Sequence, residues 1–471
     1  MKDRILASDI RNALNTKVLL RGWIDTRRDH GKLIFLDLRD MSGKVQMVVL
    51  PNQQEVHRIA EILRTGWVVE IEGKVNPRPE KMVNVDEPNG DIEVEVLSLT
   101  VLNESETSPF DYTADTKEID ETTRLKYRYL DLRSERLQKN LRIRSRFVQL
   151  CREFLFRHHF TEIETPLLTA STAEGSRDFI VPSRLHPGKF YALPQSPQQY
   201  KQLLMTAGFE RYFQIARAIR DEDLRADRGF EHSQIDIEMS FVKREEVMKL
   251  VEDMITQTIL DMGYTLKEKP FPIISYKEAL EKYGADKFDL RTEEEKEQNV
   301  LAYAWVIDFP LFEKTEGGTW TFSHNPFSAP LPEHKDWLLS GKNIGEVLSS
   351  QYDLVCNGFE TGGGSVRSHE PEVLRAVYTT MGHSEKEIET RVGHMLEAYG
   401  YGTPPHGGIA LGIERNVMNL TGEDTLRDVQ AFPMTRGGHT SVMKGPSSVE
   451  PEQLKELGIQ IIKSEDTDTA H

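Results

Sequence analysis

Apolar and polar residues alternate in short runs through the first hundred positions, and a period of two is the pattern of β-strands. Turn residues separate five such runs: KVLLRGWID (17–25), KLIFLDLRD (32–40), KVQMVVL (44–50), GWVVEIEGKV (66–75) and DIEVEVLSLTVL (91–102). Five short strands at this spacing are typical of a small closed barrel. The pattern predicts a five-stranded N-terminal β-barrel over residues 1–105.

The pattern changes beyond the barrel. Residues 106–135 include an acidic, irregular stretch, which predicts a linker or hinge. From 136 to 447 long helical periodicities alternate with strands, but not in a strand–helix–strand rhythm, so we expect an α+β domain with an antiparallel sheet. Residues 448–471 form a C-terminal extension whose last stretch, KSEDTDTAH, is too polar to pack.

One predicted hairpin carries an unusual density of charge. RYFQIARAIR (211–220) and SQIDIEMSF (233–241) read as strands on either side of a charged loop. Because side chains alternate along a strand, one polar floor is expected, formed by Arg220, Glu222, Gln234, Asp236 and Glu238. Charge at inner strand positions is costly unless a ligand or partner charges use it. The alternative interpretation is a surface hairpin held by ion pairs.

Composition narrows the class of protein. The formal net charge of −17 over 471 residues argues against nonspecific nucleic-acid binding by the whole surface, DNA included. Residues 124–146 nevertheless hold nine basic residues against two acidic ones, either a solvated helix face or a phosphate-facing patch. No apolar run is long enough to span a membrane and the first residues do not resemble a signal peptide, so we expect a cytoplasmic protein. Cys151 and Cys356 fit no metal-binding spacing and are expected to be buried.

Several motifs, in order along nearly the whole chain, resemble the bacterial-type aspartyl-tRNA synthetases, which belong to class II. IRDEDLRADRGFEHSQID (219–236) is similar to motif 2, and GGIALGIERNVMNLTG (407–422) to motif 3. FTEIETPLLTASTAEGSRDF (160–179) is similar to motif 1, which places Pro166 at the bend of a dimer-forming strand. The stretches LPQSPQQYKQLLM (193–205) and NGFETGGGSVR (357–367) resemble the amino-acid pocket. The resemblance implies a homodimeric ligase that joins L-aspartate to tRNA(Asp) with ATP and Mg²⁺.

The resemblance also implies how ATP is held. Arg220 would bridge the aspartate carboxylate and the α-phosphate, Arg415 would contact the γ-phosphate, and Asp353 and Glu360 would hold magnesium. A carboxylate is already a nucleophile, so catalysis should rest on positioning and charge neutralisation rather than on a base. The other residues that the resemblance assigns to ATP are Asp221, Glu222, Gly229, His232, Gln234, Glu360, Gly412, Ile413 and Glu414.

A selective aspartate pocket needs cations for the side-chain carboxylate and an anion for the amine. By resemblance Lys201 and Arg367 supply the cations and Asp236 the anion, and Arg220 reaches the α-carboxylate. The supporting polar residues would be Glu174, Ser196, Gln198 and His324. Two alternatives stay open here: Lys201 as a helix-surface lysine, and His324 as an ordinary cleft histidine. Asparagine as the substrate is less favoured, because a neutral amide leaves both cations without an anion.

The barrel resembles the OB-fold anticodon domain of the same family. Phe35 would stack on an anticodon base, with Arg28, Gln46 and Arg78 contacting the bases, although Phe35 could instead be a barrel core residue. His30 is typical of enzymes that also charge tRNA(Asn), whereas Lys81 stands where those enzymes carry glycine. We expect weaker charging of tRNA(Asn) than of tRNA(Asp), with His30 as a plain turn residue left open.

The chain departs from the family pattern in several places. Glu414 replaces the usual aspartate of motif 3, His232 stands where a phenylalanine stacks on adenine, and Asn325 replaces the second histidine of a pair. Between residues 291 and 305, where bacterial members carry a whole extra domain, only TEEEKEQNVLAYA is present, so we expect a short helix or loop there. A catalytically silent RNA-binding relative is the rival hypothesis, and the presence of Arg220, Arg415 and both magnesium acids favours the ligase.

Overall fold

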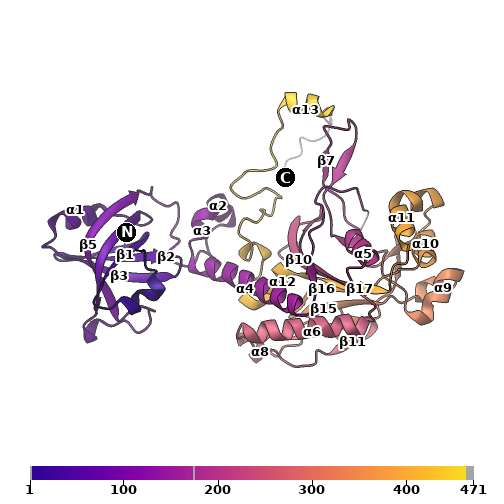
Figure 1. The fold of residues 1–471 in the computed structure, drawn as a ribbon, viewed down its shortest axis with the longest axis horizontal. Helices are drawn as coiled ribbons and strands as arrows, with labels where there is room; N and C mark the ends of the chain where they lie inside the picture. The colour runs from indigo at the N-terminus through magenta and orange to yellow at the C-terminus, as the bar shows by residue number, and fades with distance from the viewer. Residues whose placement is uncertain (1–2, 173–174, 463–471) are drawn as a thin grey trace. The chain divides into compact units, whose positions relative to one another are not determined.

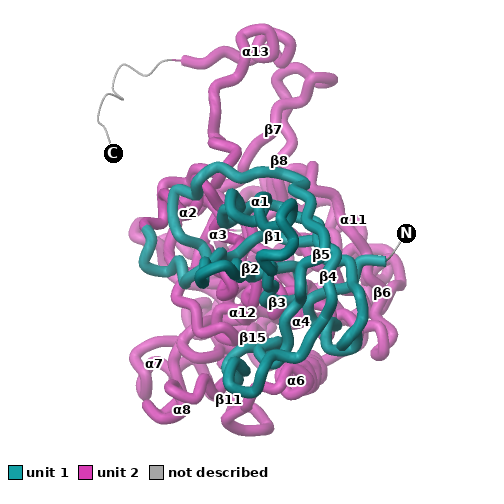
Figure 2. The backbone as a smooth tube through the Cα atoms, turned by 90° about the vertical axis from the view of Figure 1, so that its left-hand side faces the viewer, with its two compact units in different colours: residues 1–119 teal, residues 120–471 magenta. Residues whose placement is uncertain are grey.

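The computed structural model describes residues 3–172 and 175–462, and the chain divides into two units, residues 1–119 and 120–471 (Figure 2). The boundary falls inside the predicted linker. Two stretches named above lie outside the described residues: Glu174 of the predicted aspartate pocket, and the polar tail 463–471.

The first unit is a closed five-stranded barrel, as predicted. Its strand order is β1-β2-β3-β5-β4, with β3 and β5 the only parallel neighbours among the barrel pairs of the described chain. The strands are β1 (Lys17–His30), β2 (Leu33–Asp40), β3 (Gly43–Val49), β4 (Val68–Pro77) and β5 (Ile92–Asn103), and α1 (Gln54–Ile62) lies between β3 and β4 in the chain. β1 runs further than its apolar pattern indicated and ends at His30, so His30 lies on a strand.

Strand β2 shows how the alternation separates the core from the outer surface. Ile34, Leu36 and Leu38 are buried in the barrel core, whereas Phe35 and Asp37 are only half-buried. Successive side chains of a strand point to opposite faces, so Phe35 lies on the outer face. The alternative that Phe35 is a core residue is therefore wrong.

The second unit contains an eight-stranded sheet of order β11-β12-β15-β16-β17-β10-β9-β6. The two edge pairs, β11–β12 and β6–β9, are parallel, and all the pairs between them are antiparallel. The strands are β6 (Thr161–Glu162), β9 (Arg211–Ile219), β10 (Glu231–Ser240), β11 (Ile273–Ser275), β12 (Tyr303–Ile307), β15 (Gln351–Cys356), β16 (Phe359–Val366) and β17 (His406–Gly412). The predicted α+β class with a mainly antiparallel sheet is confirmed.

Helices cover the two faces of this sheet unequally. α4 (Glu135–Arg157), α6 (Arg244–Asp261) and α12 (Ile413–Thr421) share one core with alternate residues of the central strands, among them Ile235, Ile237, Leu354 and Ile409. Figure 1 shows α6 along one side of these strands and α5 (Gln198–Thr206) on the other. The strand positions between the core residues thus face α5, and these are the positions that carry charge.

Three arginines of the basic run 124–146 belong neither to a solvated face nor to a phosphate-facing patch. Arg124 and Arg128 are buried, and Arg128 lies 2.6 Å from Asp131 and donates to the backbone oxygens of Arg427, Gln430 and Ala431. Arg136 pairs with Glu423 at 2.6 Å. Burial of a guanidinium requires such partners, so these arginines fasten the start of unit 2 to its C-terminal part. Cys151 and Cys356 are buried, as expected.

A short helix closes the chain where relatives were expected to insert a domain. Thr292 caps α8 (Glu293–Glu297), and Glu295 completes a capping box by bonding back to the Thr292 backbone. β12 follows six residues later and pairs normally with β11 and β15. The prediction of a short closing helix and an undisturbed sheet is confirmed.

The remaining elements surround the sheet. They are α2 (Glu121–Lys126), α3 (Arg128–Asp131), β7 (Ile180–Pro182), β8 (Phe190–Ala192), α7 (Tyr276–Tyr283), β13 (Phe312–Lys314), β14 (Trp320–Phe322), α9 (Lys335–Ser340), α10 (Pro371–Thr380), α11 (Glu385–Tyr399) and α13 (Pro451–Leu457). The β7–β8 hairpin and α13 lie at one end of unit 2, where Arg184 and Glu456 approach to 3.7 Å (Figures 1 and 2). Within the described part of the chain no helix is long and apolar enough to cross a bilayer.

Candidate active site

The polar face of strand β10 carries three of the five residues predicted for the floor, whereas Arg220 and Glu222 lie beyond the end of β9, in the loop. Ile235, Ile237 and Met239 enter the helical core, so Gln234, Asp236 and Glu238 point to the opposite face. These three side chains are buried although they are polar or charged. The alternative of a surface hairpin held by ion pairs is therefore wrong for this strand.

Two cations meet two of these carboxylates. Lys201 Nζ lies 2.6 Å from Asp236 Oδ1 and 3.2 Å from Glu238 Oε2, and Arg367 grips Glu238 with Nε and Nη2 at 2.9 and 3.1 Å. Lys201 and Arg367 are each only 2% exposed. Lys201 is therefore not a helix-surface lysine. The four groups form a buried cluster with no net formal charge, which we call the ion cluster.

The two acids of the ion cluster differ in acidity. Burial opposes charge on Glu238, but Arg367 and Lys201 outweigh it and lower its pKa to about 2. Burial raises the pKa of Asp236 against the pull of Lys201. Glu238 is thus firmly ionised, whereas the charge on Asp236 depends on cations nearby.

Two oxygens at the floor accept no hydrogen bond in the described structure: Asp236 Oδ2 and Gln234 Oε1. The neighbouring hydroxyl of Tyr212 donates to Gln214 instead, at 2.9 Å. Buried acceptors are normally paired. Two open acceptors beside each other on β10 suit a ligand that brings several N–H donors, such as an ammonium.

A second acidic site lies on β15 and β16. A Cβ added to Gly363 would lie 3.1 Å from Asp353 Oδ1 and 3.5 Å from Glu360 Oε1, so the glycine leaves room between the two carboxylates. Burial and the nearby Glu360 raise the pKa of Asp353. His324 Nε2 lies 3.5 Å from Asp353, and its pKa is raised because the carboxylate outweighs the effect of burial.

The fit of a divalent cation to this site can be judged from its donors. Asp353 and Glu360 offer hard oxygen ligands of the kind that Mg²⁺ takes. Among the residues described, no cluster of three or more His, Cys, Asp or Glu side chains could hold a metal ion. Two carboxylates fit a magnesium ion that takes its other ligands from phosphates and water.

The two predicted arginines lie on different elements. Arg220 begins the loop between β9 and β10. Its backbone N–H donates to the backbone oxygen of Phe230 at 2.8 Å, and its Nε donates to the backbone oxygen of Gln195 at 3.3 Å. Arg415 lies in the first turn of α12 and donates to Glu360 O at 2.9 Å. Its Nη2 also lies 3.0 Å from Asp227 of the loop. Arg415 therefore links the loop to the acidic site.

A hydrogen bond and two ion pairs hold the rest of the loop between β9 and β10. Glu222 accepts from Ser176 and lies 3.3 Å from Arg228, while Asp221 lies 3.3 Å from Arg177. Burial, together with Arg220 and Arg415, lowers the pKa of His232 to about 3. The His232 imidazole is therefore neutral at physiological pH.

The other residues predicted to bind ATP lie at the start of α12 and in the loop between β9 and β10. Glu414 accepts from the Ser233 backbone at 3.0 Å, from Arg144 at 2.9 Å and from Gln430 at 3.1 Å. Gly412 is the N-cap of α12 and Ile413 packs in the core. Gly229 lies in the loop, where an added Cβ would meet Leu426 at an ordinary contact distance of 3.6 Å.

The supporting residues of the predicted aspartate pocket are placed near α5. Gln198 begins α5, is buried and donates to Gln202 at 3.2 Å, and Ser196 lies two residues before it. Positions 198 and 201 are three apart, so they share a helix face. Pro166 is not in a strand: it follows β6, is exposed and precedes the exposed Leu167 and Leu168.

Sequence reasoning missed partners that lie far away in the chain. Glu238 was placed on the floor without a role, and Lys287, 2.9 Å from Glu360, was not singled out. Asp227 and Gln195 were also missed as partners of the arginines. The period of two along β10 placed Glu238 on the floor but does not indicate its partners, and nothing in the loop sequence around Lys287 indicates its contact.

The outer face of the barrel gathers most of the predicted anticodon residues. Arg28 Nη2 donates to Asp37 at 3.0 Å and to Gln46 at 3.2 Å, and Gln46 in turn donates to Glu93 at 3.2 Å. The rings of His30 and Phe35 meet edge to face, with centroids 5.7 Å apart. Arg78 and Lys81 lie after β4, where Arg78 donates to Ile92 O at 2.9 Å and Lys81 is exposed.

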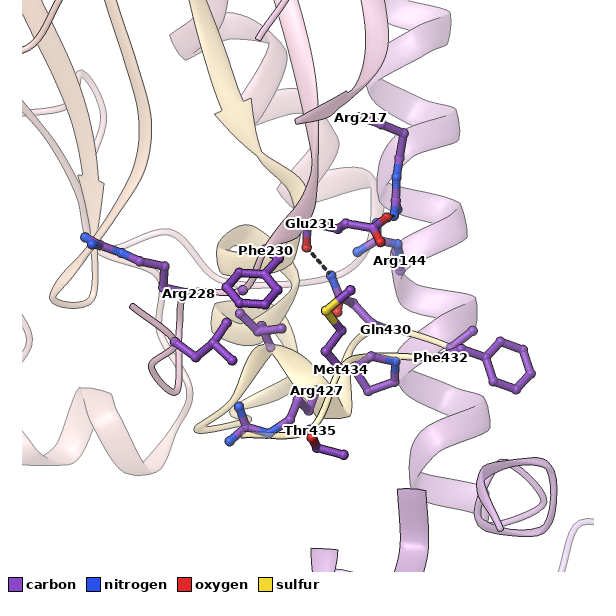
Figure 3. Close-up of a pocket in the computed structure, with 15 residues that line it drawn as sticks. Arg144, Arg217, Arg228, Phe230, Glu231, Arg427, Gln430, Phe432, Met434 and Thr435 are labelled. Atoms are coloured by element: carbon purple, nitrogen blue, oxygen red, sulfur yellow. Dashed lines mark hydrogen bonds and ion pairs between the residues drawn. The ribbon is translucent and has the colours of Figure 1, made fainter. Parts of the chain in front are cut away.

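A pocket of about 350 Å³ lies apart from the ion cluster, between the β9–β10 loop and residues 426–435 (Figure 3). Its four arginines already face carboxylates of the chain: Arg144 faces Glu414, Arg217 faces Glu231, Arg228 faces Glu222 and Arg427 faces Glu121. Figure 3 shows Gln430 reaching the Glu231 backbone, a bond of 3.3 Å. The side chains that line this pocket are therefore engaged in holding the loop and residues 426–435 in place.

Residues 120–436 match the family model of tRNA synthetases class II (D, K and N), and residues 18–102 match that of the OB-fold nucleic acid binding domain. The chain belongs to the class II tRNA synthetases. This class II synthetase is therefore an aminoacyl-tRNA ligase with an OB-fold anticodon-binding domain.

Curated relatives of this synthetase cover almost its whole length. An aspartate–tRNA(Asp/Asn) ligase of Rubrobacter xylanophilus is 39% identical and aligns over 94% of this chain and 94% of its own. One of Dehalococcoides mccartyi is 37% identical, over 95% of this chain and 97% of its own. The first alignment runs over 571 positions against a chain of 471 residues, so at least 100 positions of that relative face no residue here. The relative is longer within the aligned range, as the predicted missing domain requires.

Solved structures share the fold of this synthetase. Asparaginyl-tRNA synthetase of Pyrococcus horikoshii, complexed with asparaginyl-adenylate, matches with a TM-score of 0.73 at 24% identity, over 92% of this chain and 99% of its own. Aspartyl-tRNA synthetase of Entamoeba histolytica matches with a TM-score of 0.73 at 22% identity, over 92% and 91%. At this identity the similarity establishes the fold. Which amino acid is the substrate has to be inferred from the residues of the site.

Proposed function

We propose that this synthetase activates L-aspartate with ATP and transfers it to tRNA(Asp). The observation that carries this proposal is the buried pair of cations, Lys201 and Arg367, beside the open acceptor oxygen of Asp236. A dicarboxylate with an ammonium group complements these three groups: its side-chain carboxylate would face the charges of Lys201 and Arg367, and its own ammonium would face the open oxygen of Asp236. The names of the curated relatives agree with this assignment.

In the first step an oxygen of the aspartate α-carboxylate attacks the α-phosphorus of ATP, and the bond from that phosphorus to the bridging oxygen breaks. Pyrophosphate leaves and carries away the electron pair. Arg220 would contact both the attacking carboxylate and the α-phosphate, and Arg415 the far end of the triphosphate. These cations stabilise charge that develops in the transition state, which is the main source of catalysis when no base is needed.

Asp353 and Glu360 would hold magnesium, which neutralises phosphate charge when it is bound. Gly363 leaves the space between the two carboxylates. The remaining residues assigned to ATP would shape its site: the neutral His232 can lie against the adenine ring, and Glu222 lies on the same loop.

In the second step a hydroxyl of the terminal ribose of tRNA attacks the carbonyl carbon of the aspartyl-adenylate. AMP leaves as the new ester bond forms, and the hydroxyl proton is passed to the leaving phosphate or to water. The anticodon would be read on the barrel, where Phe35 offers a half-buried ring on the outer face and Arg28, Gln46 and Arg78 offer polar groups.

We further propose that the synthetase acts as a homodimer in the cytoplasm. A groove of about 680 Å³ along α4 is lined partly by apolar side chains, among them Leu141, Val148, Phe156 and Ile215. Phe156 is 52% exposed, and Leu167 and Leu168 beside Pro166 are also exposed. Exposed apolar side chains of this kind suit an interface with a second copy.

A pyrophosphate-exchange assay tests the activity. The wild-type enzyme should incorporate labelled pyrophosphate into ATP with L-aspartate and Mg²⁺, and much less with L-asparagine. A site built for a charged group rejects the uncharged analogue by about 10⁴-fold or more. Exchange with asparagine instead would identify the alternative substrate, and no exchange with either amino acid would favour a silent RNA-binding protein.

We also expect tRNA(Asn) to be aspartylated, though less well than tRNA(Asp). The two anticodons differ at one edge base, and His30, packed against Phe35, can hydrogen-bond either base, whereas the bulky Lys81 opposes one of them. Purified tRNA(Asp) and tRNA(Asn), assayed separately with labelled aspartate, measure the ratio. Lys81→Gly should raise charging of tRNA(Asn), and His30→Leu should lower it. Charging of tRNA(Asn) no higher than of a noncognate tRNA would contradict this reading of His30.

A further inference from the structure

Lys287 is a cation at the acidic site to which no role has yet been given. Its Nζ lies 2.9 Å from Glu360 Oε2, and Arg415 donates to the backbone oxygen of the same Glu360 at 2.9 Å. The two cations therefore reach one residue from different elements, a loop after α7 and the first turn of α12. The Lys287 side chain is 40% exposed, so it can change partner without disturbing a core.

The backbone around Lys287 is firmly held, although the side chain is not. The next residue, Phe288, is buried and stacks on Tyr283 with ring centroids 4.3 Å apart. Its carbonyl accepts from the Gly358 N–H at 3.0 Å, in the turn between β15 and β16. Gly358 lies two residues before Glu360. The loop is thus fastened to the hairpin that carries both acids, which keeps the ammonium within reach of whatever binds there.

We propose that Lys287 is a nucleotide-positioning residue, whose ammonium holds Glu360 in the free enzyme and moves to the β- and γ-phosphates when ATP and magnesium enter. This inference rests on the proposed function. A divalent cation on Glu360 competes with the ammonium for the same carboxylate, and it arrives with phosphates that carry negative charge. The ammonium therefore exchanges one anion for another nearby, while Glu360 exchanges one cation for another.

Lys287 would keep this contact with the same two phosphates after they become pyrophosphate, until pyrophosphate leaves. Arg415 contacts the backbone oxygen of Glu360 and Lys287 contacts its carboxylate, so together they would form a pair of donors for the part of the triphosphate that becomes the leaving group. Lysine is well suited to this role, because its ammonium is a compact charge on a flexible stem.

Binding measurements on Lys287→Ala, Lys287→Arg and the wild-type enzyme test the proposal. Calorimetric titration with magnesium pyrophosphate, and with the magnesium salt of α,β-methylene ATP, should give a Kd about tenfold or more higher for Lys287→Ala, the effect of one lost charge-assisted hydrogen bond. In the exchange assay the KM for pyrophosphate should rise by a similar factor, with the KM for aspartate within about twofold of wild type. Lys287→Arg should restore most of the affinity.

Lys277→Ala is the matched control, because it removes the same charge from an exposed position on α7, where Lys277 is 85% exposed. It should bind both ligands like the wild type. Unchanged affinity in Lys287→Ala would overturn the proposal, and so would tighter binding, which would mean that the lysine only obstructs the magnesium site. Wild-type enzyme without aspartate-dependent exchange would instead reject the proposed function.

Discussion

Replacing Arg220 with alanine should reduce aspartate-dependent pyrophosphate exchange by about a hundredfold or more, as removal of one transition-state donor does in other enzymes. The side chain is half-buried and makes one long bond, to Gln195 O at 3.3 Å. The bond from its backbone N–H to Phe230 survives the substitution. The guanidinium therefore matters little to the free protein, and its proposed partners arrive with the substrates.

The measurement compares exchange rates and thermal unfolding for Arg220→Ala and Arg217→Ala. Arg217 lies three residues earlier on β9, is exposed and faces Glu231, so it matches the charge change away from the ion cluster. Arg217→Ala should stay close to wild type in activity, and both variants should unfold at nearly the wild-type temperature. Exchange by Arg220→Ala within tenfold of wild type would reject the role assigned to this arginine.

The parts of the fold that follow from local periodicity could be predicted from the sequence. The five barrel strands and the β9–β10 hairpin were located because strand side chains alternate and turn residues bound each run. The same alternation placed Gln234, Asp236 and Glu238 on one face. The end of β1 was not predicted, because its last residues are polar and only pairing with β2 keeps them extended.

Contacts between distant segments could not be predicted in this way. The residue types at Lys201, Asp236 and Arg367 were identified by resemblance, but not that Lys201 and Asp236 pair with each other at 2.6 Å. Arg128 was read as part of a surface patch, since a sequence does not show that carbonyls three hundred residues later will surround it. Burial of a charge is decided by tertiary partners, which no local pattern encodes.

The second large effect is expected from Lys201→Met in the ion cluster. This substitution should lower both the stability of the protein and its activity. Lys201→Met leaves Asp236 and Glu238 with only Arg367 among the cations of the cluster, and loss of one partner from a buried pair costs about 3–5 kcal/mol in the free energy of unfolding. Aspartate-dependent exchange should fall by a factor of about 30 or more, because truncating one member of a buried charge pair costs at least about 2 kcal/mol in binding.

The double variant Lys201→Met/Asp236→Asn separates the two effects. It replaces both charges of the pair with neutral side chains of similar size, so most of the lost stability should return while exchange stays at or below the level of Lys201→Met. Saturating aspartate should raise the unfolding temperature of the wild type but not of either variant. A double variant as unstable as Lys201→Met, or one that activates aspartate faster than Lys201→Met, would contradict this account.

The pH dependence of Lys201→Met gives an independent check on the same pair. Burial already raises the pKa of Asp236 in the wild type, and without the ammonium it should rise further. The folded state then holds a proton that the unfolded state has lost, so stability falls as pH increases. The deficit relative to wild type should therefore be larger at pH 8 than at pH 5. Lys249→Met/Asp253→Asn, an exposed pair on α6, serves as the control and should cost about 0.5 kcal/mol or less. A deficit that did not grow with pH would mean that Asp236 keeps its charge without Lys201.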